Sequence, residues 1–163
     1  MSAEAEVDDL VIRDATSNDV AAIVAMLADD FLGATREDPS EPLDAHYYEA
    51  FGEISADPHH RLMVAELDGV VVGTLQITWL RYLSFKGAER ALVESVHVAA
   101  SRRNQRIGWR LMQWAIAEAT ARGCGQVQLT SNARRPYAHR FYERMGFAPS
   151  HVGFKLALPP VAP

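Results

Sequence analysis

The sequence predicts an α/β domain, an α+β arrangement in which a mixed sheet carries helices on both sides. Three observations support this class. Segments that alternate apolar and polar residues, as strands do, are interleaved with segments whose apolar residues recur every three or four positions, as in helices. An Asp-Gly pair at 68–69 joins two strand-like runs directly, which predicts an antiparallel hairpin with a type I′ turn. The 163 residues suit one domain with a proper core.

The expected elements follow one another in a simple order. They are a strand at 10–13, a helix from Thr16 or Ser17 to about Phe31, a helix at 43–54, strands at 62–67, 70–79 and 92–98, a helix from Ile107 that stops at Gly123, a strand at 126–130, a helix from Pro136 to about Met145, and strands at 147–150 and 154–158. We expect an acidic disordered tail at 1–9, a single folded domain at 10–158 and a frayed end at 159–163.

Two helices carry readable apolar stripes. In the first helix Ile23, Met26, Leu27 and Phe31 are expected to be buried, and in the long helix the apolar residues step by four. The second helix carries aromatic residues that suit either the core or the wall of a small-molecule pocket. The candidates for substrate contact are His46 and Tyr47 of this helix and Trp79 at the end of the hairpin. Trp79 is equally well explained as a cover for the sheet edge.

Positive charge is concentrated in one part of an acidic chain. Residues 101–144 contain nine arginines and two acids, whereas the whole chain has a net charge of −5. Such segregation favours an anionic ligand. Binding of nucleic acid by this segment is a minor alternative, because the chain is acidic overall and the basic loop lacks interleaved aromatic residues.

Other features exclude whole classes of protein. No apolar run approaches the roughly 20 residues that span a bilayer, and the acidic N-terminus is unlike a signal peptide. We therefore expect a cytoplasmic protein that does not bind a membrane. The lone Cys124 forms no intramolecular disulfide and is expected to be structural. No spacing of cysteines and histidines indicates a metal site.

The stretch from Leu92 to Arg110 is the centre of the functional interpretation. A strand that runs through a tight turn into a helix directs unpaired backbone N–H groups at one point, where the helix dipole also favours negative charge. Arg103 and Arg106 lie in this turn, and phosphate contact is a better explanation for them than solvation. The sequence therefore predicts a phosphate site at this turn.

Two motifs in this half of the chain resemble the GNAT superfamily of acyl-CoA-dependent N-acyltransferases. The run Arg103-Asn104-Gln105-Arg106-Ile107-Gly108 resembles the family's pyrophosphate loop, with Arg106 in place of the first glycine. The run from Ala138 to Phe147 resembles its Ala, three residues, Tyr, Gly-Phe motif without a gap. The resemblance implies a central, mostly antiparallel twisted sheet flanked by four helices, with acetyl-CoA as co-substrate.

The resemblance also implies which residues contact the coenzyme. Strand backbone would hold the pantetheine arm and loop amides the pyrophosphate, whereas Asn132 corresponds only loosely to the family's asparagine. The expected contacts are Val96, His97, Val98, Arg103, Asn104, Gln105, Arg106, Ile107, Gly108, Trp109 and Asn132.

Acyl transfer from a thioester to an amine poses three chemical problems. The amine must lose a proton, and Glu94 is the candidate base or ammonium anchor, on a strand face shared with Leu92, Val96 and Val98. The oxyanion needs a donor, which an amide near Val96 supplies if a bulge frees it. The thiolate needs a proton, and Tyr142 occupies the position of the family's general acid. The side chain of His97 is expected on the opposite face from Glu94, and His139 is a possible substrate or coenzyme contact.

The sequence favours an N-acetyltransferase that acts on a primary amine of a small molecule by direct attack, without an acyl-enzyme. Its C-terminal motif is most similar to the branch that acetylates aminoalkylphosphonates and related amines. The alternatives are a protein N-acetyltransferase and a non-catalytic acyl-CoA-binding or regulatory module. A homodimer is possible.

Overall fold

The computed structural model describes residues 9–159. The expected tails at 1–9 and 159–163 therefore lie almost wholly outside the described residues. The chain divides into two compact units, Met1–Gln128 and Leu129–Pro163, and each is described by itself.

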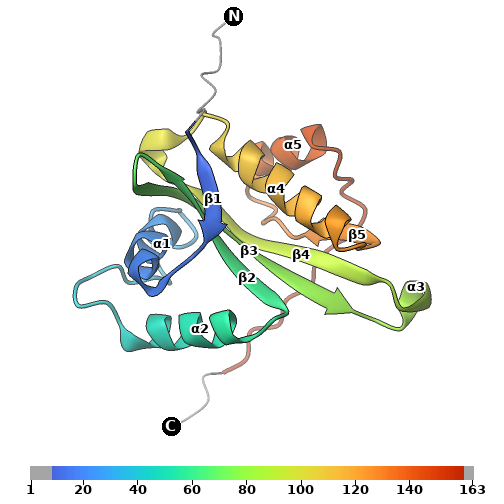
Figure 1. The fold of residues 1–163 in the computed structure, drawn as a ribbon, viewed down its shortest axis with the longest axis horizontal. Coiled ribbons are helices and arrows are strands. Elements are labelled where there is room, and N and C mark those ends of the chain that lie inside the picture. The colour runs from blue at the N-terminus through green and yellow to red at the C-terminus, as the bar shows by residue number, and fades with distance from the viewer. Residues whose placement is uncertain (1–8, 160–163) are drawn as a thin grey trace, which may run out of the picture. The chain divides into compact units, whose positions relative to one another are not determined.

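The first unit is built on a five-stranded sheet whose spatial order follows the chain order (Figure 1). The pairs β1–β2, β2–β3 and β3–β4 are antiparallel. This confirms the predicted hairpin and the mostly antiparallel sheet that the family resemblance implies. At the β2–β3 turn Asp68 and Gly69 have φ values of 53° and 75°, the positive angles that a type I′ turn requires. The strands are β1 (Val11–Asp14), β2 (His60–Leu67), β3 (Val70–Arg81), β4 (Glu89–Val98) and β5 (Gln126–Leu129).

Helices cover both faces of this sheet. On one face, Gly73 of β3 lies against Ile107 and Leu111 of α4 (Ile107–Ala121), where a Cβ on Gly73 would come within 3.0–3.1 Å of their side chains. The next residue, Thr74, faces the other way. Its partner on β2, Val64, packs with Ile23 and Met26 of α1 (Val20–Ala28).

The helices confirm most of the expected stripes. Along α4, the four residues that step by four are all buried: Ile107, Leu111, Ala115 and Ala119. Gly123 follows with φ 78° and ends the helix as predicted. The expectation for Phe31 was wrong, because α1 ends at Ala28 and Phe31 lies in the exposed turn beyond it. The remaining elements of this unit are α2 (Ala45–Ala56), the single turn α3 (Ser84–Gly87) and short 3₁₀ turns at Ser17–Asp19 and Ala100–Arg102.

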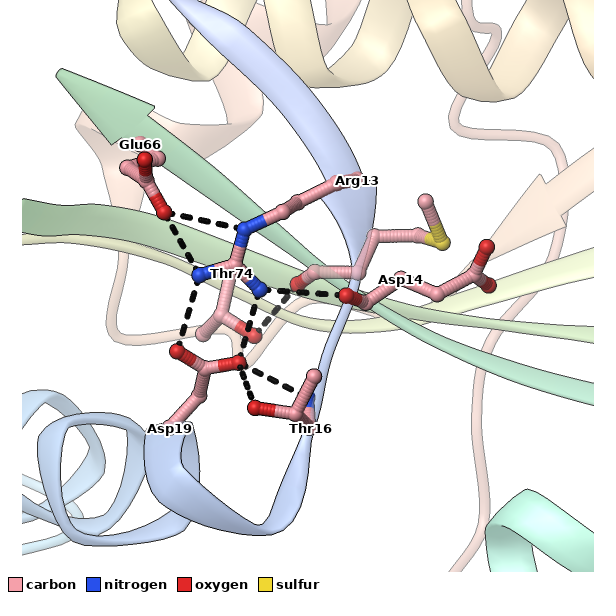
Figure 2. A network of polar contacts seen from close by, with 7 residues as sticks. Arg13, Asp14, Thr16, Asp19, Glu66 and Thr74 are labelled. Atoms are coloured by element: carbon pink, nitrogen blue, oxygen red, sulfur yellow. Dashed lines mark hydrogen bonds and ion pairs between the residues drawn. The ribbon is translucent and has the colours of Figure 1, made fainter. Parts of the chain in front are cut away.

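A polar network fastens the start of α1 to the edge of the sheet (Figure 2). The guanidinium of Arg13 on β1 donates to Asp19 at 2.7 and 3.0 Å and to Glu66 on β2 at 2.6 and 2.9 Å. Asp19 also accepts the backbone N–H of Thr16 at 2.7 Å, which is one half of a capping box. The hydrogen bond from Arg13, and then those from Thr16, lower the pKa of the buried Asp19 carboxyl to about 2.

This network predicts a loss of stability in acid. A carboxyl whose pKa is lower in the folded chain than the unfolded value of about 3.9 contributes stability above pH 4, and loses it as the pH falls through 2. We expect Asp19 to contribute about 2 kcal/mol to the free energy of unfolding at pH 6 that is absent near pH 2. Urea denaturation of wild type and Asp19→Asn across this range measures the difference. Equal pH slopes in the two proteins would contradict the assignment.

The second unit contains one helix, α5 (Pro136–Arg144), with Pro136 in its first turn as predicted. The expected strands at 147–150 and 154–158 are wrong for the described chain, which has neither helix nor strand from Gly146 to Pro159. Apolar alternation marks a segment that can become a strand, but a strand forms only where its backbone groups find a paired edge.

Within the described residues, no helix combines the length and apolar character needed to cross a membrane.

Candidate functional site

The loop before α4 has the backbone shape that a phosphate loop requires. Arg106, immediately before the helix, has φ 58° and ψ 8°, and Asn104 has φ 64°. These are left-handed angles, which glycine adopts without cost and asparagine tolerates. Arginine thus stands in the conformation that the family's glycine would supply. The loop therefore has its left-handed turn although arginine takes the place of the family's glycine.

The N-terminus of α4 lies in this loop. No side chain caps the helix, and no acidic residue lies in its first turn. The amides of Ile107 and Gly108 lie in the first turn of α4, before the Arg110 N–H, which donates to the Arg106 carbonyl at 3.0 Å. Together with the helix dipole they favour a phosphate group.

The side chains of the loop are largely exposed, and that of Arg103 is paired within the protein. Arg103 donates to Asp29 at the end of α1, at 3.0 Å, with both side chains about half exposed. Gln105, Gly108 and Trp109 are half-buried, and Asn104 and Arg106 are exposed. The backbone of this loop is therefore better placed to define a phosphate site than the Arg103 guanidinium.

The left-handed Arg106 gives a direct test of strain. A non-glycine residue in this conformation costs roughly 1 kcal/mol, so we expect Arg106→Gly to raise the free energy of unfolding by about that amount. Arg106→Ala removes the guanidinium but keeps the Cβ, and it should gain no such stability. Urea denaturation measures both. The gain would be absent if Arg106 did not adopt this conformation in solution.

A β-bulge interrupts the pairing of β4 next to this loop. Gln76 of β3 faces Glu94, and Thr74 faces His97, so the two residues Ser95 and Val96 face the single Leu75. Ser95 has φ 52°. A bulge of this kind leaves ladder groups unpaired at the extra residue, so the structure contains the irregularity that the oxyanion hypothesis requires.

The bulge changes which side chains share a face. Because Thr74 and Gln76 lie two residues apart on β3, their partners His97 and Glu94 lie on the same side of the sheet. The expectation that His97 faces away from Glu94 was therefore wrong. The extra residue of the bulge shifts by one position the alternation of β4 side chains between the two faces of the sheet. The sequence of apolar and polar residues in β4 does not reveal this shift.

Glu94 lies in a polar environment instead of the apolar one expected from its strand. It is exposed, and a row of polar residues on β2 and β3 shares its face. His60 Nδ1 lies 3.0 Å from Thr78 Oγ1 and 3.4 Å from Gln76 Nε2. His60 Nε2 lies 3.6 Å from the Asp57 carboxylate. The face therefore offers a second ionisable group and two neutral hydrogen-bonding groups beside the carboxylate.

Sequence reasoning missed this row and did not include His60 among the candidate site residues. The available signal was the alternation of Thr74, Gln76 and Thr78 in a strand that is otherwise apolar. Polar residues at every second position of a central strand form a row on one face.

Trp79 does not belong to this face. It pairs with Ala91, is only 4% exposed, and lies on the side of the sheet that packs on α4. The Arg122 guanidinium stacks over its ring at 4.8 Å and donates to the buried Glu89 at 2.6 Å. This burial argues against the expected substrate contact at Trp79.

The two substrate candidates on α2 differ in their surroundings. His46 is exposed and bonds to Asp44, the residue that caps the helix. Tyr47 packs on the cluster of Val20, Val24 and Leu43. Its hydroxyl accepts the Asp38 N–H at 3.0 Å and donates to Glu37 at 3.1 Å. Tyr47 thus anchors the loop before α2.

In the second unit, Tyr142 has the surroundings of a protonated phenol. Its ring makes edge contacts with Phe141 and Phe147 at centroid distances of 5.2 and 5.9 Å. Burial raises the pKa of the Tyr142 hydroxyl, although Arg135 opposes the change. The phenol therefore keeps its proton to a higher pH than a free tyrosine.

Asn132 organises the start of the same unit. Its side-chain oxygen accepts the Arg134 N–H at 2.9 Å, and its carbonyl accepts the Arg135 N–H at 3.0 Å. The ring of His139 lies 2.8 Å from the same carbonyl through Nε2. Local bonds therefore hold both predicted contact residues, Asn132 and His139, in place.

An uncapped helix start, a loop with left-handed residues before it and a bulged strand beside a carboxylate are the features expected of an acyltransferase that uses a coenzyme A thioester. Residues 22–147 match the family model of the Acetyltransferase (GNAT) family. The chain belongs to this family, whose members use acetyl-CoA.

Comparison with individual proteins agrees with the family assignment. The chain is 31% identical over 154 residues to the aminoalkylphosphonate N-acetyltransferase of Salmonella typhimurium, covering 90% of each chain. The chain is also 44% identical to a transcriptional regulator from Bacillus halodurans C-125 of known crystal structure. The two folds superpose with a TM-score of 0.89, over 91% of this chain and 99% of the regulator. The crystal structure of a predicted acetyltransferase from Clostridium acetobutylicum with acetyl-CoA shares the fold at 15% sequence identity. Its TM-score is 0.70, over 91% of this chain and 96% of that protein.

Proposed function

We propose that this protein transfers the acetyl group of acetyl-CoA to a primary amine of a small molecule by direct attack. The observation that carries the proposal is the β4 bulge at Ser95 and Val96, which lies between the exposed Glu94 and the phosphate loop along one continuous segment. The family assignment supports acetyl-CoA as the donor.

The loop before α4 would bind the diphosphate of the coenzyme. The amides of Ile107 and Gly108 would supply donors at the left-handed turn that Arg106 makes. The strand backbone from Val96 to Val98 would hold the pantetheine arm. Acetyl-CoA itself supplies the activated thioester.

Glu94 would take the proton from the substrate ammonium, or hold the ammonium in place. The polar face around it suits a charged amine, because Gln76 and His60 add hydrogen-bonding groups beside the carboxylate. An amide freed at the bulge would stabilise the oxyanion. Tyr142, whose pKa is raised by burial, would donate a proton to the departing thiolate.

Aminoalkylphosphonates are our preferred acceptors. The support is the 31% identity to an enzyme of that activity over 90% of both chains. A substrate of this kind joins a primary amine to a dianionic group. Protein amines are a second substrate class within the same chemistry.

A screen of acceptors tests the proposal. Purified protein is incubated with acetyl-CoA and aminoalkylphosphonates, polyamines, aminoglycosides or lysine peptides, and release of free thiol is followed. We expect turnover with an aminoalkylphosphonate, and acetylation of its nitrogen by mass spectrometry. Binding of acetyl-CoA without turnover of any acceptor would favour a regulatory module.

A regulatory role on DNA is the second candidate, and the 44% identity to the Bacillus halodurans transcriptional regulator favours it. Residues 101–144 contain nine arginines, and those not held by ion pairs within the protein, as Arg103 and Arg122 are, would provide phosphate contacts. DNA binding that weakens steeply between 50 and 200 mM salt, combined with no amine turnover, would support this role.

A further inference from the structure

The β3–β4 hairpin ends in the turn α3 (Figure 1), where an arginine lies against two aromatic rings. The guanidinium carbon of Arg90 is 5.0 Å from the centre of the Tyr82 ring and 4.8 Å from that of the Phe85 ring. Arg90 Nη2 also donates to Ser84 Oγ at 3.1 Å. These contacts hold the guanidinium at one position, so less conformational freedom is lost when it binds a further group.

The backbone of this turn has an uncommon conformation. Phe85 and Lys86 have φ values of 54° and 56°, left-handed angles that bulky residues seldom adopt. Such a conformation persists where surrounding contacts favour it, and it is concentrated at functional sites. The Phe85 ring is 74% exposed and gains little from burial, whereas its contact with Arg90 is one that this conformation provides.

Arg90 also differs from neighbouring arginines in its lack of a carboxylate partner. Arg81 and Arg122 both pair with Glu89, at 3.5 and 2.6 Å. Within residues 9–159, no acid pairs with Arg90, and its hydrogen bond to Ser84 leaves its other N–H groups available. The flat fork of a guanidinium matches the oxygens of a carboxylate, phosphate or phosphonate. A positioned guanidinium without an internal acid is therefore suited to an external anion.

Arg90 lies on the same face of β4 as Glu94. Before the bulge, Arg90, Leu92 and Glu94 pair with successive alternate residues of β3, so their side chains share one side of the sheet. At about 3.3 Å per residue, the Cα atoms of Arg90 and Glu94 are roughly 13 Å apart. This face therefore has a carboxylate beside the bulge and a guanidinium near the end of the hairpin.

We propose, on the basis of the proposed function, that Arg90 binds the anionic group of the acceptor whose amine lies at Glu94. The acceptor then lies along β4 with its ammonium at the carboxylate and its anion at the guanidinium. Arg90 thereby selects acceptors that carry a phosphonate or carboxylate. Simple alkylamines and polyamines lack the group that Arg90 recognises, so they should be poorer acceptors.

Steady-state kinetics with two acceptors that differ only in the anion test the role of Arg90. We expect wild type to prefer 3-aminopropylphosphonate to propylamine. Arg90→Gln should raise the KM for the phosphonate about 10- to 100-fold, as expected for loss of a charge-assisted contact, and leave its kcat and the kinetics with propylamine unchanged. Lys86→Gln is the matched control, because it removes an exposed positive charge from the same hairpin and should change neither acceptor. An equal loss with both acceptors, or no loss in Arg90→Gln, would overturn the proposal.

Calorimetric titration provides a readout that does not depend on turnover. 3-Aminopropylphosphonate is titrated into protein saturated with coenzyme A, which has no acetyl group to transfer. We expect binding that weakens about 10- to 100-fold in Arg90→Gln. Such binding without turnover of any amine would overturn the proposed function and support the role of Arg90. Turnover and binding that are both independent of Arg90 would overturn its role alone.

The same titration with 4-aminobutyrate compares the two kinds of anion. Its carboxylate follows the same three-carbon chain but carries a single charge. We expect weaker binding than for the phosphonate, with the same dependence on Arg90. Binding of 4-aminobutyrate that is insensitive to Arg90→Gln would overturn the selection of carboxylates.

Discussion

Replacing Tyr142 with phenylalanine should lower kcat by about 10²- to 10³-fold, with little change in the KM for the amine. The substitution removes the hydroxyl and keeps the ring, so the edge contacts with Phe141 and Phe147 remain. Thiol release from acetyl-CoA under saturating amine measures the effect. Tyr137→Phe is the matched control, because Tyr137 lies on the same helix with an exposed ring, and it should leave kcat unchanged.

The loss should depend on the leaving group if Tyr142 acts as an acid. An acetyl thioester of a more acidic thiol needs less protonation as it departs, so the penalty of Tyr142→Phe should shrink with such a donor. The pH profile gives a second readout. Because burial raises the pKa of the Tyr142 phenol, the wild-type rate should hold to a higher pH than an ordinary tyrosine would allow. A penalty that is equal for both donors would indicate a packing defect.

Local signals predicted most of the fold. The β2–β3 turn followed from Asp68-Gly69, because few other pairs accept two positive φ angles in succession. The long helix followed from apolar residues at steps of four and from the glycine that ends it. In each case the residues that carry the signal also determine the local conformation.

The candidate site was harder to predict, because its geometry depends on register. The bulge at Ser95 and Val96 is defined by how β4 pairs with β3, and Ser95 carries no residue-type signal for a positive φ. Side-chain alternation assumes an uninterrupted strand, so it placed His97 on the wrong face. The same assumption placed Glu94 in an apolar setting. The polar row with His60 and Gln76 emerges only when two strands are aligned.

The last two predicted strands failed for a related reason. Residues 154–158 have strand composition, but composition does not supply the neighbouring edge.

Replacing Glu94 with glutamine should lower kcat/KM at pH 7 by about 10²- to 10⁴-fold if the carboxylate removes the proton from the amine. Glutamine keeps the size and hydrogen-bonding capacity of the side chain but cannot accept the proton. The variant should fold normally, because Glu94 is exposed and outside the core. Steady-state kinetics with the best amine of the acceptor screen measure the loss.

The pH dependence separates a base from an ammonium anchor. An alkylamine loses its own proton near pH 10, so the rate of Glu94→Gln should recover toward that pH if the missing function is proton removal. Removal of an anchor would instead raise the KM for the amine and leave kcat nearly unchanged. Since Glu94 lies in a polar row with His60 and Gln76, a residual rate that disappears in Glu94→Gln combined with His60→Gln would identify His60 as the second proton acceptor. An unchanged kcat and KM in Glu94→Gln would exclude both roles.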